Sequence, residues 1–322
     1  MALASLLSPA EGVAVRVDVD SYLARIGFTE RPPPTLDALR ALHRAHVERV
    51  PYETFEIHLG RPTTIDPEES AARILRRRGG YCYHLNGAFS LLLRALGYEI
   101  SWHRAGVQGD ADSPPGTEQA NHLALTASGL ASDESPDGRW LVDVGLGDAL
   151  YEPLPLHPGE YAQGTFRYRL RRSEVEPGGW RLDHDPRGAF VGMDWRPGIA
   201  VLSEFAAKHH WLSTSPDSGF VKTASAQRRD AAGVDLLRGR VLTRLDAAGR
   251  TDRTIETAAD WYAVLADVYG LDFPDVDAPA RDALWRRVVA AHEARFGAGG
   301  EAVRGEEPDT RPNVPDPEDG VA

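Results

Sequence analysis

The stretch that decides the fold is Arg78-Gly79-Gly80-Tyr81-Cys82-Tyr83-His84-Leu85-Asn86, which runs on into Gly87-Ala88-Phe89-Ser90-Leu91-Leu92-Leu93-Arg94-Ala95-Leu96-Gly97. From Leu85 onward its apolar residues recur at steps of three and four, the spacing of an amphipathic helix that ends at Gly97. Two glycines precede the helix and allow another backbone or a ligand to come close. The stretch therefore predicts Cys82 in the first turn of a helix.

Cys82 is the only cysteine among 322 residues, so no disulfide can form within the chain. Unpaired N–H groups and the helix dipole favour an anion at a helix N-terminus, so we expect this thiol to ionise easily. A lone cysteine can equally be a small buried hydrophobic residue. A nucleophile needs a base, and the interpretation depends on finding one.

Two strand-like segments supply a candidate base. Residues 121–126 and 140–144 alternate in polarity, and the segment between them has the composition of a loop. A hairpin that pairs Ala127 with Gly138 also pairs His122 with Asp143, with Cβ atoms about 5 Å apart. Asp143 could then fix the tautomer of His122 and leave its other nitrogen for a thiol. Either residue alone could be structural, but together with Cys82 they predict a nucleophile, a base and an orienting carboxylate.

The rest of the chain predicts an α+β protein. Residues 17–97 show helical periodicity, and beyond Gly97 the period changes to two, as in a small antiparallel barrel or sandwich. The later elements are a helix at 203–211, strands at 220–227 and 241–245, and helices at 258–269 and 280–296. We expect a helical bundle at 1–99, a β-barrel at 100–200, an α/β lid at 201–297 and a disordered tail at 298–322.

Composition excludes several classes of function. The chain is 42% hydrophobic and 26% charged, with a net charge of −12 and a pI near 5.4. Such a chain has no bulk attraction for nucleic acid or for an anionic membrane. No signal peptide and no apolar run long enough to span a bilayer is visible, and a single cysteine fits a cytoplasmic location.

Other motifs are weaker. His209-His210 and Asp183-His184-Asp185 could ligate a metal, but neither has a matching second pair of ligands, so we expect no metal site. Gly145-Leu146-Gly147 lacks the third glycine and the following helix of a dinucleotide-binding loop.

The motifs together resemble those of the arylamine N-acetyltransferase family, over roughly residues 18–296. The matching segments are Arg78-Gly79-Gly80-Tyr81-Cys82, Asn121-His122-Leu123, Leu141-Val142-Asp143-Val144-Gly145-Leu146-Gly147 with Glu152-Pro153-Leu154-Pro155-Leu156, Val50-Pro51-Tyr52-Glu53-Thr54-Phe55, and Trp211-Leu212-Ser213-Thr214-Ser215-Pro216-Asp217-Ser218-Gly219-Phe220. The resemblance implies a papain-like cysteine-triad fold, with an N-terminal helical bundle, a central antiparallel β-barrel and a C-terminal α/β lid. It assigns Cys82 as nucleophile, His122 as base and Asp143 as orienter.

The resemblance also implies the substrates. Acetyl-CoA would be a co-substrate, with no permanently bound cofactor, and the acceptor an arylamine, a hydrazine or an arylhydroxylamine. Near the cleft we expect Thr214 and Ser215 to contact CoA, and Tyr52 and Leu146 to contact the acceptor ring. The sequence leaves the oligomeric state open.

The chain departs from the family at His84, where an acidic residue is usual, and in a long loop between His122 and Asp143. The leading hypothesis is ping-pong acetyl transfer through a Cys82 thioester. An amide synthase that closes a macrolactam from a polyketide acyl chain and an aromatic amine is the first alternative. A cysteine peptidase and a binding protein without turnover are the others.

Overall fold

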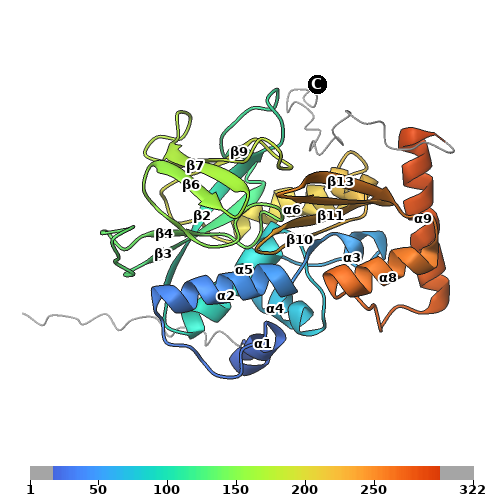
Figure 1. Cartoon of the computed structure of the whole chain (residues 1–322), viewed down its shortest axis with the longest axis horizontal. Helices are drawn as coiled ribbons and strands as arrows, with labels where there is room; N and C mark the ends of the chain where they lie inside the picture. The colour runs from blue at the N-terminus through green and yellow to red at the C-terminus, as the bar shows by residue number, and fades with distance from the viewer. Residues whose placement is uncertain (1–16, 298–322) are drawn as a thin grey trace, which may run out of the picture.

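The computed structural model of the chain describes residues 17–297, so the predicted tail 298–322 lies outside the described residues. The N-terminal helices are α1 (Val19–Arg25), α2 (Leu36–Arg49), α3 (Phe55–His58), α4 (Pro67–Leu75) and α5 (Cys82–Ala95). Side-chain caps start three of them: Asp18 accepts from the Ser21 amide, Thr35 from Ala38, and Asp66 from Glu68 and Glu69. The predicted helical bundle is present, with α5 at its centre (Figure 1).

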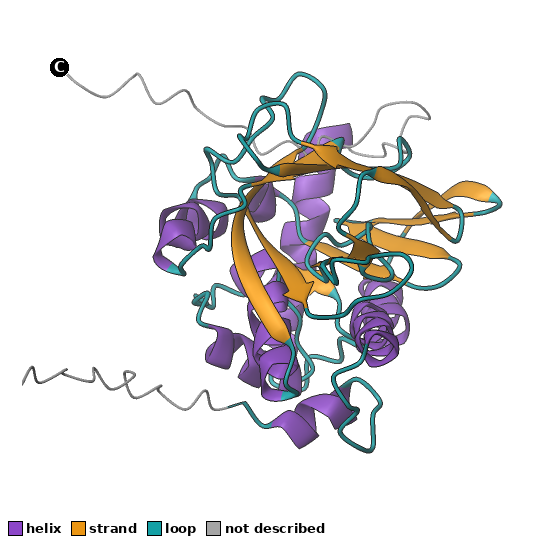
Figure 2. Cartoon of the chain, turned by 90° about the vertical axis from the view of Figure 1, so that its left-hand side faces the viewer, coloured by secondary structure: helices purple, strands orange, loops and turns teal. Residues whose placement is uncertain are grey.

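The middle of the chain forms an eight-stranded antiparallel sheet in the order β5-β4-β3-β2-β9-β8-β7-β6. The strands are β2 (Glu99–Gln108), β3 (His122–Ser128), β4 (Trp140–Val142), β5 (Leu154–Pro155), β6 (Gly159–Gln163), β7 (Phe166–Arg172), β8 (Trp180–Asp183) and β9 (Gly192–Trp195). The sheet curls into a nearly closed barrel rather than a sandwich, as the bent strands in Figure 2 show.

A second antiparallel sheet, in the order β1-β10-β11-β12-β13, belongs mostly to the C-terminal part. Its elements and their helices are β1 (Tyr52–Glu53), β10 (Ser225–Arg229), β11 (Gly233–Arg238), β12 (Val241–Asp246), β13 (Gly249–Thr254), α6 (Ser203–Thr214), α7 (Gly219–Lys222), α8 (Ala258–Tyr269) and α9 (Ala278–Phe296). Helices α8 and α9 lie at the end of the molecule away from the barrel (Figure 1).

Two sequence predictions about this second sheet were wrong. Residues 52–53 lie in a segment predicted to be helical, but they form β1, in which Tyr52 pairs with Gln227 of β10. The predicted strand at 220–227 is helical at its start, because Ser218 accepts from the Phe220 amide and begins α7. The domain boundaries stay predictions. Strand β1 lies within the predicted bundle, 1–99, but pairs with β10 of the predicted lid, 201–297.

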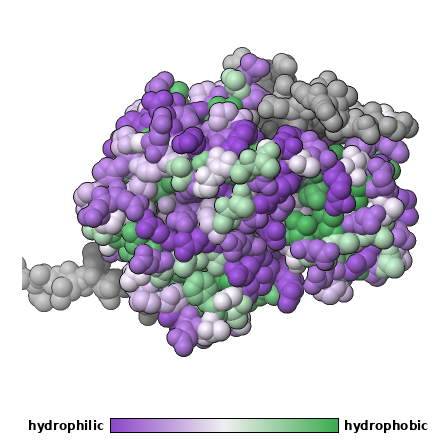
Figure 3. Space-filling model, viewed as in Figure 1, coloured by the Kyte–Doolittle hydropathy of each residue, from purple (hydrophilic) through white to green (hydrophobic). Residues whose placement is uncertain are grey.

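Three apolar clusters make up the core of the described residues. One joins the helical bundle to the barrel, with Phe89 of α5 and Leu125 of β3 both fully buried in it. The second fills the barrel, and the third lies between β10, β11, α8 and α9. Hydrophilic residues cover most of the face in Figure 3, with hydrophobic ones in scattered groups. Within residues 17–297, no helix is both long and apolar enough to cross a bilayer.

Candidate active site

Cys82 is the first residue of α5, as the sequence predicted. Tyr81 before it has extended backbone (φ −101°, ψ −174°) and is the N-cap. The thiol is buried, with Sγ 3.5 Å from the Asn121 carbonyl oxygen at the start of β3. Gly145 packs directly against it, since a Cβ atom there would lie 2.8 Å from Cys82 Cα. The cysteine therefore lies where the helix start, β3 and the segment after β4 meet.

His122 and Asp143 form a buried pair beside this cysteine. The Nε2 atom of His122 is 2.7 Å from Oδ2 of Asp143, and the two side chains are 2% and 0% exposed. The other carboxylate oxygen, Oδ1, accepts from the Asn86 side chain at 2.8 Å and from the Gly145 amide at 2.9 Å. Both carboxylate oxygens are thus hydrogen-bonded, so Asp143 is held in one orientation.

The predicted register of the hairpin was wrong by two residues. In the structure Thr126 pairs with Leu141 and Leu125 with Val142, which puts Asp143 level with Ala124 rather than with His122. His122 and Asp143 meet diagonally instead, because a shift of two residues leaves a side chain on the same face of a sheet. The predicted contact is therefore present, although the predicted pairing is not.

The surroundings of His122 favour its protonated form. Burial alone would lower the pKa of this imidazole, but the Asp143 carboxylate and the hydrogen-bonded Cys82 sulfur outweigh that penalty and raise the pKa to about 10. With Nε2 facing Asp143, Nδ1 is the nitrogen left for the thiol. The arrangement can hold a proton on His122 next to a negatively charged sulfur.

Asn86 is a site residue that the sequence analysis missed. It lies one turn after Cys82 on α5 and is fully buried. Its Nδ2 also donates to the Leu123 carbonyl at 2.7 Å, while its Oδ1 accepts from the Val144 amide at 2.9 Å. One side chain therefore links the helix to both strands. The four-residue spacing from Cys82 was the available signal, because it places both residues on one face of the helix.

The other predicted contacts lie in two places. Tyr52 and Leu146 line one pocket together with Asp143, Gly147 and Gln227, so the structure does bring them to the site. Thr214 is the exposed last residue of α6, with its hydroxyl 2.7 Å from the His210 carbonyl, and Ser215 is the C-cap. The following turn reaches the site through Phe220, whose ring centroid is 5.0 Å from that of Tyr81.

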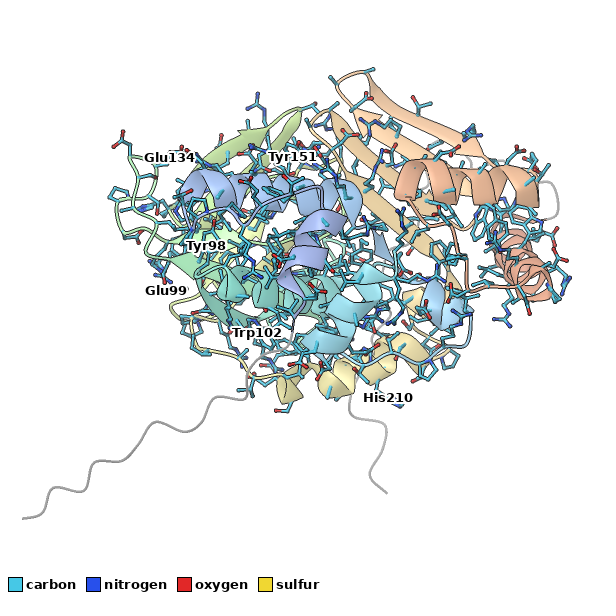
Figure 4. All side chains as sticks on the ribbon, turned by 90° about the horizontal axis from the view of Figure 1, so that it is seen from below. Tyr98, Glu99, Trp102, Glu134, Tyr151 and His210 are labelled. Atoms are coloured by element: carbon cyan, nitrogen blue, oxygen red, sulfur yellow. The ribbon has the colours of Figure 1, made fainter. Side chains whose placement is uncertain are left out.

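Two of the candidate metal ligands, Asp183 and His209, have protein partners instead. Asp183 binds Arg171 and Arg181, and His209 contacts Tyr81 and the Thr63 carbonyl. His210, labelled in Figure 4, points outward from α6. Within residues 17–297 no group of three or more His, Cys, Asp and Glu side chains could hold a metal ion.

A second buried histidine–aspartate pair lies after the Gly145-Leu146-Gly147 segment. His184 Nε2 is 3.3 Å from Asp148 Oδ1, with side chains 0% and 1% exposed, but neither of these two atoms makes a hydrogen bond. The Asp148 Oδ2 atom accepts from the Ala189 amide at 2.6 Å. The imidazole packs between the rings of Tyr168 and Phe190.

Comparison with known proteins agrees with this geometry. A family model described as N-acetyltransferase matches residues 35–277. The chain is similar to the arylamine N-acetyltransferase of Mycolicibacterium smegmatis, at 32% identity over 81% of this chain and 94% of that relative. The chain belongs to the arylamine N-acetyltransferase family. The enzyme of Escherichia coli (strain K12) is 33% identical over 80% of this chain and 90% of its own length.

Solved structures of this family share the fold. The arylamine N-acetyltransferase of M. tuberculosis superposes with a TM-score of 0.73 at 28% identity, covering 85% of this chain and all 100% of that one. The Mycobacterium marinum enzyme in complex with CoA has the same TM-score and identity, and covers 85% of this chain and 99% of that one. The resemblance and the fold class inferred from the sequence are confirmed, and the chain is an acyltransferase enzyme.

Proposed function

We propose that this enzyme transfers an acetyl group from acetyl-CoA to the nitrogen of an arylamine, a hydrazine or an arylhydroxylamine, through a Cys82 thioester. The observation that carries the proposal is the buried His122 imidazole, held between the Asp143 carboxylate at 2.7 Å and the Cys82 sulfur. The M. marinum relative in complex with CoA supports the donor. A Salmonella typhimurium relative named arylamine N-acetyltransferase / N-hydroxyarylamine O-acetyltransferase, 28% identical, supports the class of acceptor.

In the first half-reaction the Cys82 thiolate attacks the carbonyl carbon of the acetyl thioester. The bond between that carbon and the CoA sulfur breaks, and His122 gives its proton to the departing sulfur, so CoA leaves as a thiol. The acetyl group stays on Cys82, and His122 becomes neutral. N–H groups in the first turn of α5 have no partner within the helix and favour the negative charge that Cys82 carries beforehand.

In the second half-reaction the amine nitrogen attacks the acetyl carbon on Cys82. His122 accepts a proton from the amine while the carbon–sulfur bond breaks, which yields the amide and returns the thiolate and the imidazolium. Asp143 and Asn86 keep the imidazole in one orientation through both steps. No metal or bound cofactor takes part in this scheme.

For the substrates we propose contacts at two places. Tyr52 and Leu146 share a pocket with Asp143 and would contact the acceptor ring. Thr214 and Ser215 end α6 and would contact CoA. No contact among the described residues favours macrolactam formation, peptide hydrolysis or binding without turnover over acetyl transfer. A cytoplasmic location stays a prediction.

The experiment is a CoA-release assay with acetyl-CoA and a panel of arylamines and hydrazines. We expect release that depends on the amine, and the same assay with Cys82→Ala should give background rates with an unchanged fold by circular dichroism. Peptide hydrolysis without CoA, or release that persists in Cys82→Ala, would contradict the proposal.

A further inference from the structure

His84 has a specific place at the start of the nucleophile helix. It lies two residues after Cys82, is 1% exposed, and its Nδ1 atom is 3.2 Å from the Tyr81 amide nitrogen. This amide is the backbone N–H of the N-cap residue, and the side chain at the third helical position is placed to accept from it. Room for the ring comes from Gly80 (φ +154°), where a Cβ atom would lie 2.7 Å from His84 Nδ1.

The same ring belongs to a closed circuit of hydrogen bonds. His84 Nε2 is 3.4 Å from the Thr63 hydroxyl, and the Thr63 carbonyl oxygen is 2.9 Å from His209 Nε2. The circuit closes where His209 Nδ1 meets the Tyr81 hydroxyl at 2.6 Å. Two imidazoles thus bridge Tyr81 and Thr63, and His209 brings in α6, which lies beside the start of α5 (Figure 1).

The partners determine the proton on each ring. The Tyr81 amide can only donate, so His84 Nδ1 is an acceptor and the ring proton is on Nε2, where the Thr63 hydroxyl accepts it. The Thr63 carbonyl can only accept, so His209 donates from Nε2. Burial lowers the pKa of His209, which leaves Nδ1 unprotonated to accept from the Tyr81 hydroxyl. Both rings are therefore neutral Nε2–H tautomers.

The charges around His84 keep it neutral. Burial lowers the pKa of His84 well below its ordinary value, against a small opposing effect of the Thr64 backbone. Arg73 of α4, itself 3% exposed, and His209 of α6 act in the same direction as burial. Glu69 of α4 is held by the Thr64 amide and hydroxyl. A protonated His84 would turn an N–H toward the Tyr81 N–H, two donors facing each other, so the contact exists only for the neutral ring.

We propose that His84 is a positioning residue for Cys82: its neutral Nδ1 fixes the Tyr81 amide, and through Thr63 and His209 it holds the first turn of α5 against α6. The inference rests on the proposed role of Cys82 as nucleophile. The Tyr81 N–H requires a hydrogen-bond acceptor at position 84, and this acceptor does not have to be charged.

The test compares His84→Ala with His84→Gln. Alanine removes the acceptor, whereas glutamine offers an amide oxygen at the position where Glu or Gln completes a capping box. We expect His84→Ala to slow the alkylation of Cys82 by iodoacetamide about fivefold and to lower kcat by a similar factor, with KM for acetyl-CoA unchanged. His84→Gln should restore both to within about twofold of the wild-type rate.

His103→Ala is the matched control. His103 is also buried, at 3% exposure, and bridges the Gly198 carbonyl and the Thr126 hydroxyl, away from Cys82. The His103→Ala variant should lose stability in urea as His84→Ala does, without any change in the alkylation rate of Cys82. If both alanine variants slowed alkylation equally, or His84→Gln behaved like His84→Ala, the positioning role would be wrong.

A measurement on the wild-type chain keeps the inference testable if His84→Ala does not fold. Nitrogen-15 spectra of the histidine rings, assigned by the signal lost in His84→Gln, should show His84 as the Nε2–H tautomer at neutral pH. An imidazolium or an Nδ1–H tautomer would overturn the inference. Neither the alkylation rate nor the tautomer measurement uses acetyl-CoA. Both can therefore support the positioning role of His84 even if no acetyl transfer is observed.

Discussion

Two buried histidine–aspartate pairs occur in the described part of the chain, and they differ in nearly every contact. In the first, His122 and Asp143 are 2.7 Å apart, and the carboxylate also accepts from Asn86 and Gly145. In the second, His184 and Asp148 are 3.3 Å apart, and neither ring nitrogen of His184 has a hydrogen-bond partner. Burial is the same in both pairs, so burial alone does not make a reactive centre.

The surroundings explain the difference. Beside the first pair lies Cys82, and its interaction with His122 contributes to the raised pKa of that imidazole. The second pair faces the rings of Tyr168 and Phe190 and the backbone of Gly188, where a Cβ atom would lie 2.4 Å from the imidazole. Burial would raise the pKa of Asp148, but the neighbouring His184 and the Ala189 amide outweigh this and lower the pKa below its ordinary value. A histidine–aspartate pair becomes a candidate base only where a nucleophile and an orienting network meet it.

The largest expected effect separates the two carboxylates. Asp143→Asn replaces a carboxylate that holds His122 with an amide that can favour the wrong tautomer, and we expect acetyl transfer to fall by about 10³- to 10⁴-fold, as in serine proteases. Asp148→Asn should stay within about threefold of the wild-type rate, since it removes no charge next to the thiol. Steady-state CoA release and thermal unfolding of both variants check this. Equal losses of activity would remove the distinction between the pairs.

The next effect concerns the orientation of the first pair. Asn86→Ala deletes the donor to Asp143 and leaves buried groups without a partner, which costs about 1–3 kcal/mol or about 5- to 150-fold in rate. Ser90→Ala, one turn further along α5, removes a buried hydroxyl that accepts from Trp102 Nε1 and is the matched control. It should lose stability but retain kcat. An Asn86→Ala enzyme with wild-type kcat would mean that Asp143 needs no such support.

The last effect is on stability rather than on rate, and it contrasts two histidines that both contact Asp143. Burial lowers the pKa of His43 to about 4, although the Tyr151 and Asp143 carbonyls, each 3.0 Å from a ring nitrogen, act in the other direction. The neutral ring donates to only one of these two carbonyls. Between the ordinary value of about 6.5 and pH 4 the unfolded chain therefore binds more protons at this position, so acidification removes stability, by roughly 3 kcal/mol at pH 4. His122 changes the free energy of unfolding in the opposite direction. Its stabilising contribution is complete below pH 6.5 and is lost as the pH rises through about 10.

Unfolding in urea between pH 4.5 and pH 7.5 measures this difference. His43→Gln cannot titrate, so its free energy of unfolding should fall less steeply with acidification than that of the wild type. Parallel curves for the two proteins would show that His43 does not enter the folded state as a neutral ring.

The sequence predicted more of the site than of its surroundings. Helix periodicity and the preceding glycines were enough to place Cys82 at the start of α5, and α8 has the predicted bounds 258–269. The His122–Asp143 contact was also predicted, in spite of the wrong register, because the period of a strand is two and an error of two residues keeps the face.

What the sequence did not predict depends on contacts between distant residues. Strand β1 is two residues long and so has no periodicity of its own, and its partner Gln227 comes far later in the chain. Likewise, the Tyr81–His209 hydrogen bond depends on how α6 docks against α5. The role of Asn86 becomes visible only after β3 and β4 are placed, since Leu123 lies in β3 whereas Asp143 and Val144 directly follow β4.

The central claim is that Cys82 carries the acetyl group, and intact-protein mass spectrometry tests it most directly. Incubation with acetyl-CoA and no amine should add the mass of one acetyl group, release one equivalent of CoA and block alkylation of Cys82 by iodoacetamide. Addition of an arylamine should remove the adduct and restore alkylation, while Cys82→Ala should gain no mass. If the folded wild-type protein gained no acetyl mass on Cys82 while acetyl-CoA remained intact, the acetyl-enzyme mechanism would be contradicted.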